Sequence, residues 1–395
     1  MNKKYSLKTL VIAVCVCVAV AVMLTSVLFA FVIVPLREGR LNQYNQKLLE
    51  INSLVEKYYM GDVDEEVMKD CLAYGYVAGL NDRYAGYITA SDAEANKNSM
   101  MGYNTGIGVQ VTAHPDTGNI YVSEVHSESP ADKAGIKKGD QITALDGQSV
   151  AEKGYSWALE YIPTIPLGDK ITADVLRSGT TLTVEIELSV YVAQTVFYEK
   201  IDDMGYIAIT SFNDKTVEQF KNAVDSLIEQ NAAGLIFDVR GNAGGTLNSV
   251  RQMVDYLVPE GLIVKVDYKD DNVDETYLSD AHEIDIPMAV LTDENSASAS
   301  ELFAQSLIDF NKAVTVGRKT YGKGVVQTTF TLSDGSQVRF TVAKYYTNSG
   351  TCVDGEGITP TVPIEWTEDE LKYRYVNGIR ADKDYLAAVK YLKAQ

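Results

Sequence analysis

The stretch Gly234-Leu-Ile-Phe-Asp-Val-Arg-Gly-Asn-Ala-Gly-Gly245 has the pattern of a buried strand that runs directly into a tight turn. Its first part is almost continuously apolar, which is typical of a strand covered on both faces, and its second part is rich in glycine. An amphipathic helix is expected before it, at Thr216–Glu229, and another after it, to about Leu257. This order predicts a parallel sheet with helices on its faces.

The same alternation continues further along the chain. Met288–Thr292 and Ala313–Gly317 have the composition of buried strands, and the residues between them have a helical pattern. We therefore predict an α/β fold whose core, residues 191–365, is built from repeated βαβ units around a mostly parallel sheet. Functional groups gather at the carboxyl ends of such strands, so Gly241–Gly245 and Asn295–Ser300 mark the expected site.

Three polar side chains near these strand ends have the chemistry of a hydrolase. Ser298 lies at a helix start, where rigid backbone holds its hydroxyl and the helix dipole favours negative charge. Lys323 lies between two glycines, and burial in an apolar site would lower its pKa and make it a competent base. In an extended strand Gln327 faces the same side as Lys323. The alternative is that the serines at this helix start only cap the helix.

The glycine-rich turn at Gly241–Gly245 leaves backbone N–H groups free to point into a site, as in an oxyanion hole. A tight turn without chemistry is the alternative interpretation. The three histidines have unremarkable surroundings in the sequence, so a Ser-His-Asp arrangement is not expected. They are His114, His126 and His282.

Charge and cysteine content exclude several classes of protein. The net charge is −19, and because the first forty residues carry +4, the remainder carries −23, which disfavours binding to nucleic acid. No Cys/His spacing indicates a metal site, and no cofactor is expected. Cys71 and Cys352 are either two separate thiols or a disulfide, and the sequence leaves both open.

An apolar run near the N-terminus predicts a membrane anchor. Thr9–Leu36 carries no charge, and about 20 apolar residues suffice to cross a bilayer. The lysines before it place the N-terminus in the cytoplasm and the rest of the chain outside. A cleaved signal peptide is the alternative, but the run is long for one and no small-x-small site follows. We expect residues 1–40 to form a single-pass anchor in the cell membrane.

Helical patterns flank the central part of the chain on both sides. Residues 41–102 are predicted to form a helical arm with a spacer or packing role and no chemistry. Residues 366–395 are predicted to form a C-terminal helix that packs on the core or supports a homo-oligomer.

Residues 103–190 have the element order of a small β domain. Strands surround a short helix opened by Ser129-Pro130, and Ala134-Gly-Ile-Lys-Lys-Gly-Asp140 is the most specific segment. This stretch resembles a PDZ domain. The resemblance implies that a substrate's C-terminal carboxylate meets backbone N–H groups and that its tail adds as a strand to the sheet edge. Those groups belong to Gly106, Ile107, Gly108 and Val109. Arg177 either supplies a charge near that pocket or is a solvated hairpin arginine.

Several motifs occur together in a fixed order: Asp238–Gly245, Ser296-Ala-Ser-Ala-Ser-Glu301, Tyr321-Gly-Lys-Gly-Val-Val-Gln327 and Gly357-Ile-Thr-Pro360. With the upstream PDZ pattern they resemble the carboxy-terminal processing (tail-specific) serine proteases. The departures are minor and spare the catalytic side chains; they are Ala243, Asn348 and Thr361. The resemblance implies a ClpP/crotonase-like core with an inserted PDZ domain and an active serine-type endopeptidase.

The expected mechanism uses Ser298 as nucleophile, Lys323 as general base and Gln327 to orient Lys323. Backbone N–H groups of Gly244 or Gly245 and of Ala299 would bind the oxyanion. The expected substrates are proteins or peptides with free C-termini, captured by the PDZ domain.

Two other functions are open to such a chain. A catalytically degenerate, membrane-anchored PDZ scaffold would bind C-termini without cutting them, although degenerate relatives usually lack the nucleophile or the base. A hydrolase of small esters or lipids would leave the PDZ domain unexplained.

Overall fold

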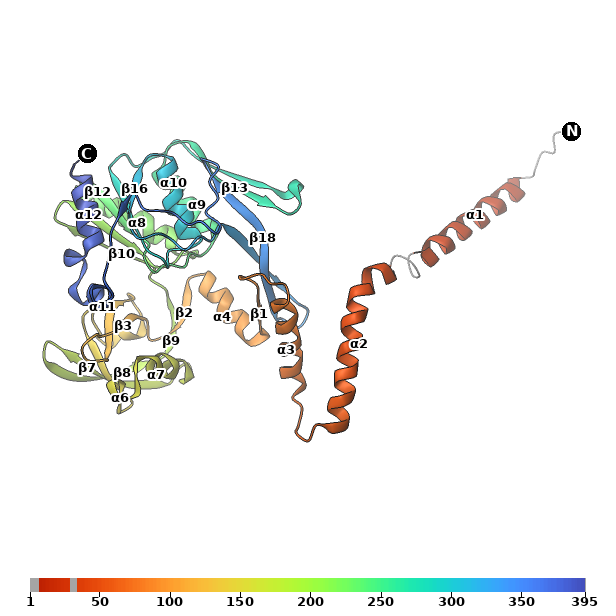
Figure 1. The fold of residues 1–395 in the computed structure, drawn as a ribbon, viewed down its shortest axis with the longest axis horizontal. Coiled ribbons are helices and arrows are strands. Elements are labelled where there is room, and N and C mark those ends of the chain that lie inside the picture. The colour runs from red at the N-terminus through yellow and green to blue at the C-terminus, as the bar shows by residue number, and fades with distance from the viewer. Residues whose placement is uncertain (1–6, 29–33, 395) are drawn as a thin grey trace. The chain divides into compact units, whose positions relative to one another are not determined.

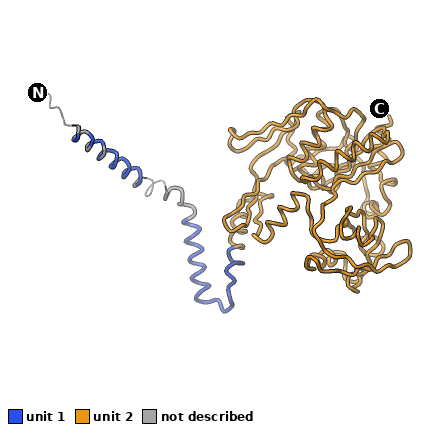
Figure 2. Tube along the Cα trace, turned by 180° about the vertical axis from the view of Figure 1, so that it is seen from behind, with its two compact units in different colours: residues 1–69 blue, residues 70–395 orange. Residues whose placement is uncertain are grey.

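The computed structural model describes residues 7–28 and 34–394, and the chain divides into two compact units, residues 1–69 and residues 70–395 (Figure 2). The first unit is helical. It contains α1 and α2 and the first turn of α3; their bounds are Leu7–Leu28, Val34–Tyr58 and Glu65–Ala78. The Asp64 carboxylate accepts hydrogen bonds from the N–H groups of Glu66 and Val67 and so caps α3.

The predicted membrane anchor falls in this unit. Within residues 7–28 and 34–394, no helix is both long enough and apolar enough to cross a membrane. Part of the predicted segment, residues 29–33, lies outside the described residues. The anchor therefore stays a prediction from the sequence.

A six-stranded sheet forms the centre of the second unit, in the order β10-β11-β12-β15-β16-β19. Every neighbouring pair is parallel except β10 and β11. The mostly parallel sheet that the apolar strands predicted is thus confirmed. In this order the strands are Val196–Ile201, Met204–Ile209, Gly234–Asp238, Met288–Thr292, Ala313–Gly317 and Val362–Pro363.

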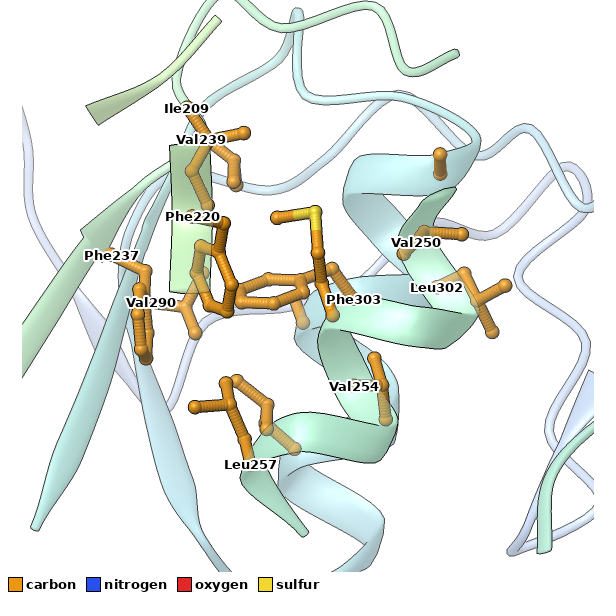
Figure 3. Packing of buried hydrophobic residues seen from close by; sticks show 14 of the residues in the cluster. Ile209, Phe220, Phe237, Val239, Val250, Val254, Leu257, Val290, Leu302 and Phe303 are labelled. Atoms are coloured by element: carbon orange, nitrogen blue, oxygen red, sulfur yellow. The ribbon is translucent and has the colours of Figure 1, made fainter. Parts of the chain in front are cut away.

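Helices cover both faces of this sheet (Figure 1). On one face, Phe237 of β12 packs against Phe220 and Phe303, with ring centroids 5.6 and 5.3 Å apart respectively (Figure 3). On the other face, Ile236 belongs to a cluster with Tyr385. Successive side chains of β12 are therefore buried on opposite faces, which explains its continuous apolar run. The helices on the first face are α8 (Thr216–Glu229), α9 (Leu247–Leu257) and α10 (Ala299–Asp309), and α12 (Lys383–Leu392) lies on the second.

The core also contains an antiparallel sheet that the sequence analysis did not predict. Its order is β1-β18-β13-β14, and β17 pairs with β18. The repeated βαβ units therefore account for only part of the core, and antiparallel strands of mixed polarity form the rest. The strands are Gly86–Ile88, Gln337–Thr347, Gly261–Tyr268, Glu275–Ser279 and Val325–Thr331 for β1, β18, β13, β14 and β17.

Residues 103–192 form the predicted small β domain. A sheet in the order β3-β4-β5-β7-β8 is completed by β6 on β5, while β2 and β9 pair at the point where the chain enters and leaves. Strands β2 to β9 are Tyr103–Gly106, Val109–Ala113, Ile120–Val125, Gln141–Leu145, Gln148–Ser149, Lys170–Arg177, Thr180–Glu187 and Ser189–Val192. The helices are α5 (Pro130–Lys133), α6 (Val150–Lys153) and α7 (Tyr155–Tyr161).

The two flanking segments differ from their predictions. The arm is not helical throughout, because β1 interrupts it before α4 (Ala90–Met100) and pairs with β18 of the core. The C-terminal helix is broken into α11 (Glu368–Asn377) and α12, because Gly378 between them has a φ of 74°. Cys71 and Cys352 are free thiols, so no disulfide joins them.

Candidate active site

Ser298 lies at the first turn of α10, just after the carboxyl end of β15. Its backbone has φ 57° and ψ −113°, an unfavourable region for a residue with a Cβ. The side chain is half-buried and lines a cavity of about 440 Å³. The position of Ser298 at a helix start after a buried strand is as predicted, whereas its strained backbone was not predicted.

Lys323 and Gln327 line the same cavity. Lys323 comes from the loop before β17, and burial, with help from the nearby Arg339 guanidinium, lowers its pKa. The negative charges of Asp82 and Glu301 act in the opposite direction. The lowered pKa is the property that a lysine base requires.

Gln327 does not make the hydrogen bond predicted for it. Its amide nitrogen donates to the Val325 carbonyl at 3.3 Å and lies 3.5 Å from the Thr341 hydroxyl. The pairing of β17 with β18 shifts register between Val326 and Gln327, which turns this side chain from the geometry of a regular strand. The structure thus brings Gln327 to the cavity but not onto Lys323.

A fully buried carboxylate ties the serine and the lysine together. Glu301 Oε2 accepts the backbone N–H of Ser298 at 2.9 Å and that of Lys323 at 2.8 Å. Its Oε1 accepts from the Thr320 hydroxyl and the Gly322 N–H. The sequence analysis missed Glu301, although its position three residues after Ser298 is the spacing of a capping box.

Tyr345 makes a second link between the same two residues. Its buried hydroxyl lies 3.1 Å from the Ser298 carbonyl and 2.9 Å from the Lys323 carbonyl. Burial raises the pKa of this phenol well above its ordinary value, so the group stays a donor. Glu301 and Tyr345 together therefore contact the backbone N–H and C=O groups of both Ser298 and Lys323.

The glycine-rich turn lies directly against Ser298. A Cβ placed on Gly244 would lie 2.9 Å from the Ser298 Cβ and 3.0 Å from the Ala299 nitrogen. The Gly244 N–H donates to the Asn242 side chain at 2.8 Å, so it is not free to bind an oxyanion as predicted. The N–H groups of Gly245 and Ala299 have no acceptor among the described residues, which leaves these two as the candidate donors.

A segment of the predicted arm reaches this site. The Asp82 carboxylate accepts the Thr341 N–H at 2.7 Å and the Thr341 hydroxyl at 3.2 Å. The Lys323 ammonium lies 4.7 Å from the centroid of the Tyr84 ring. The arm, which was predicted to be only a spacer or packing segment, therefore contacts the candidate site, and no local pattern in the sequence signalled these long-range contacts.

The small β domain has an open sheet edge next to its predicted carboxylate loop. Within the described part of the chain, strand β3 pairs only with β4, which leaves its other edge open to an added strand. Gly108 has φ 81°, and a Cβ there would lie 2.3 Å from the Ser129 Cβ, so only glycine fits this loop.

The Tyr155 hydroxyl donates to the Val111 carbonyl at 3.0 Å. Val122, which lies opposite Val111 on β4, bonds Asp140 and Gly139 with its N–H and C=O, so this is a non-hydrogen-bonded pair and the Val111 carbonyl faces the free edge.

Arg177 has a structural role in this domain. Its guanidinium donates to both oxygens of the buried Asp140 carboxylate and to the Gly135 carbonyl. The interpretation that it supplies a charge to the carboxylate loop is not supported. Nor do histidines contribute to the cavity, since none of the three lines it within the described part of the chain.

Comparison with known proteins agrees with this architecture. The model for a PDZ domain matches residues 105–188, and the model for peptidase family S41 matches residues 203–364. The carboxy-terminal processing protease CtpA of Bacillus subtilis (strain 168) is 32% identical over 342 residues, which cover 86% of this chain and 72% of CtpA. The chain belongs to peptidase family S41. It is a serine protease of the carboxy-terminal processing type with a PDZ domain.

One further relative supports this assignment, and one solved structure shares the fold. The probable CtpA-like serine protease of Staphylococcus aureus (strain COL) is 31% identical over 368 residues, covering 90% of this chain and 72% of that protein. The solved structure of a putative S41 protease from Bacteroides fragilis NCTC 9343 has a TM-score of 0.61 at 19% identity, covering 85% of this chain and 93% of the other. The latter shows that the fold is shared.

Apolar side chains form part of the lining of the cavity in this S41 peptidase, next to polar ones such as Asn213 and Thr246. Phe212, Val250 and Leu302 belong to the core cluster, and Val325 and Met100 of α4 line the cavity as well.

Proposed function

We propose that Ser298 and Lys323 are the catalytic dyad of this S41 peptidase and that its PDZ domain presents the free C-terminus of a protein substrate to them. The shared oxygen of Glu301 is the observation that carries the proposal. One buried atom accepts the N–H groups of both residues, so their backbones are fixed relative to each other at the edge of one cavity. Such fixing is what a nucleophile and its base require.

The reaction begins with proton transfer from the nucleophile to the base. The neutral Lys323 amine takes the proton of the Ser298 hydroxyl as its oxygen attacks the peptide carbonyl. The N–H groups of Gly245 and Ala299 bind the oxyanion. The Lys323 ammonium returns its proton to the leaving amine, and an ester with Ser298 remains. Lys323 then takes a proton from water, whose oxygen attacks the ester carbonyl; as the bond to Ser298 breaks, the Lys323 ammonium returns the proton to the Ser298 oxygen, which restores the hydroxyl and the neutral amine and releases the acid product.

The PDZ domain supplies the substrate class. Strand β3 offers backbone groups along a free edge, and the loop Gly106–Val109 precedes it. An extended tail added to this edge would end at the loop, where N–H groups meet its carboxylate. The substrate is therefore a protein or peptide whose C-terminus is free and whose tail is unfolded.

We further propose that residues 1–40 hold the enzyme at the cell membrane with its body outside the cytoplasm. The uncharged run Thr9–Leu36 and the preceding lysines support this. Alkaline extraction of membranes from cells that express the full chain tests it, with a chain that begins at residue 41 as the control. Release of the full chain into the soluble fraction would contradict the proposal.

Cleavage of tailed substrates tests the dyad. An unfolded protein with a free apolar C-terminus is incubated with the full chain, and the same protein with an amidated C-terminus serves as the substrate control. Lys323→Ala should lose about 10²- to 10⁴-fold in rate and Ser298→Ala at least as much. Lys319→Ala, an exposed lysine of the same loop, should keep its activity.

Two outcomes would contradict the proposal in different ways. Equal cleavage by the wild type and by Ser298→Ala would remove Ser298 from the mechanism. Binding of the tail without cleavage by the wild type would instead favour the non-catalytic PDZ scaffold.

A further inference from the structure

Tyr84 is held next to the proposed base by a segment far away in the sequence. Strand β1 pairs with β18, with Gly86 opposite Arg339, and so fixes the chain just after Tyr84. Before it, Asp82 bonds to Thr341 of the same strand and also accepts the Tyr84 N–H at 2.9 Å. The ring is therefore anchored on both sides.

The face of this ring is the contact that the structure gives to the Lys323 ammonium. The nitrogen lies 4.7 Å from the ring centroid, inside the range of about 6 Å over which a cation is attracted to an aromatic face. Among the described residues, no carboxylate lies within ion-pair distance of this nitrogen, and it donates no hydrogen bond. The ring thus replaces part of the solvation that burial removes.

The charged groups around Lys323 do not provide a closer partner. Arg339 repels the ammonium, while Asp82 and Glu301 attract it. Asp82 is already bonded to Thr341, and Glu301 accepts four hydrogen bonds from other donors. Burial raises the pKa of Tyr84, so its phenol stays neutral and acts through the ring face.

We propose that Tyr84 is a positioning residue that holds the protonated form of Lys323 in the resting enzyme and so sets how readily the neutral base becomes available. The inference rests on the proposed dyad. The ring stabilises the ammonium and not the amine, since only the cation is attracted to its face. Lys323 must leave the ring as a neutral amine to reach the Ser298 hydroxyl, and it returns when it is protonated again.

A series of variants at position 84 tests this through the acid limb of kcat/KM against pH. Tyr84→Met fills most of the space but lacks the aromatic face, so the pKa of Lys323 should fall and the limb should move to lower pH by about 0.4 to 1.5 units. Tyr84→Trp should move the limb to higher pH, because indole attracts cations best. Tyr84→Phe keeps the ring and should leave the limb in place. Tyr87→Met, in the same strand segment but bonded to Asp70, is the matched control.

The sign of the shift separates this role from a merely structural one. If the ring only excludes water, Tyr84→Met would admit solvent, the ammonium would be better solvated and the limb would move to higher pH. That result, or an unmoved limb in both Tyr84→Met and Tyr84→Trp, overturns the proposal. If Tyr84→Met does not fold, an unmoved or lowered limb in Tyr84→Trp overturns it alone. An active Lys323→Ala variant would remove the dyad as well, whereas an inactive one confines the failure to Tyr84.

Discussion

Replacing Glu301 by glutamine is the most informative single change in this site. The side chain is fully buried and accepts four hydrogen bonds, which is the capacity of an ionised carboxylate. Glutamine has nearly the same shape, but one of its oxygens is replaced by an NH₂ group that only donates. Whichever way the amide is turned, two donors lose their acceptor.

One orientation of the glutamine amide keeps the hydrogen bonds to Ser298 and Lys323. With the amide oxygen toward Ser298 and Lys323, the NH₂ group faces the Gly322 N–H and the Thr320 hydroxyl. The Thr320 oxygen accepts the Ile358 N–H at 2.6 Å and has a second lone pair for the amide, but its own O–H and the Gly322 N–H then have no acceptor. Each buried donor left without a partner costs about 1–3 kcal/mol, so Glu301→Gln should destabilise the core by about 2–6 kcal/mol. That is a large share of a typical stability of about 5–15 kcal/mol.

The measurement is the free energy of unfolding of the core transition in urea, followed by circular dichroism. Glu294→Gln is the matched control, since Glu294 is a glutamate of the preceding loop that pairs with Arg318 at the surface and should contribute at most about 1 kcal/mol. The activity of Glu301→Gln should also fall, because Ser298 and Lys323 lose their common anchor. A Glu301→Gln protein as stable and as active as Glu294→Gln would refute the reasoning.

Three further changes have defined outcomes. Arg339→Gln removes a positive charge that lowers the pKa of Lys323. That pKa should therefore rise, and the acid limb of kcat/KM should move to higher pH. A shift to lower pH would contradict this electrostatic role. Gly245→Ala places a Cβ 2.1 Å from the Phe212 carbonyl oxygen and so displaces the Gly245 N–H, a proposed oxyanion donor. The value of kcat should fall about 10²- to 10³-fold while the affinity for the tail stays unchanged. A fully active variant would exclude this donor. Tyr155→Phe removes the hydroxyl that bonds the Val111 carbonyl at the open edge of β3. A tail peptide should then bind about 2- to 10-fold tighter, as measured by calorimetry. Equal or weaker binding would show that the edge is already accessible.

The parallel sheet was predictable because its signal is local. Leu235, Ile236 and Phe237 are consecutive apolar residues, and burial on both faces is the arrangement that such a run favours. The antiparallel sheet has no comparable signal. Its strands mix polar and apolar residues, and β1 pairs with β18 across about two-thirds of the chain, so the partner of each strand is set by tertiary packing.

The candidate site was predictable only as far as motifs carry it. Ser298, Lys323 and Gln327 stand in recognisable segments, and the structure brings all three to one cavity. The sequence did not reveal how the Gln327 side chain and the Gly244 N–H are oriented. Next to a register shift, Gln327 donates to the Val325 carbonyl, and the Gly244 N–H donates to the Asn242 side chain. A hydrogen bond within a motif depends on torsions that the residue types do not determine.

The strained backbone of Ser298 connects these observations. A non-glycine residue at φ 57° and ψ −113° costs about 1–3 kcal/mol and persists only where its surroundings hold it. Here the Ser298 N–H is held by Glu301, and its carbonyl accepts from the Leu302 N–H at 2.9 Å and from the Tyr345 hydroxyl. These bonds fix the peptide groups on both sides of Ser298. They direct the Ser298 Cβ toward Gly244, beside the N–H groups of Gly245 and Ala299. The strained conformation therefore places the hydroxyl next to the groups that would bind the oxyanion formed in its attack.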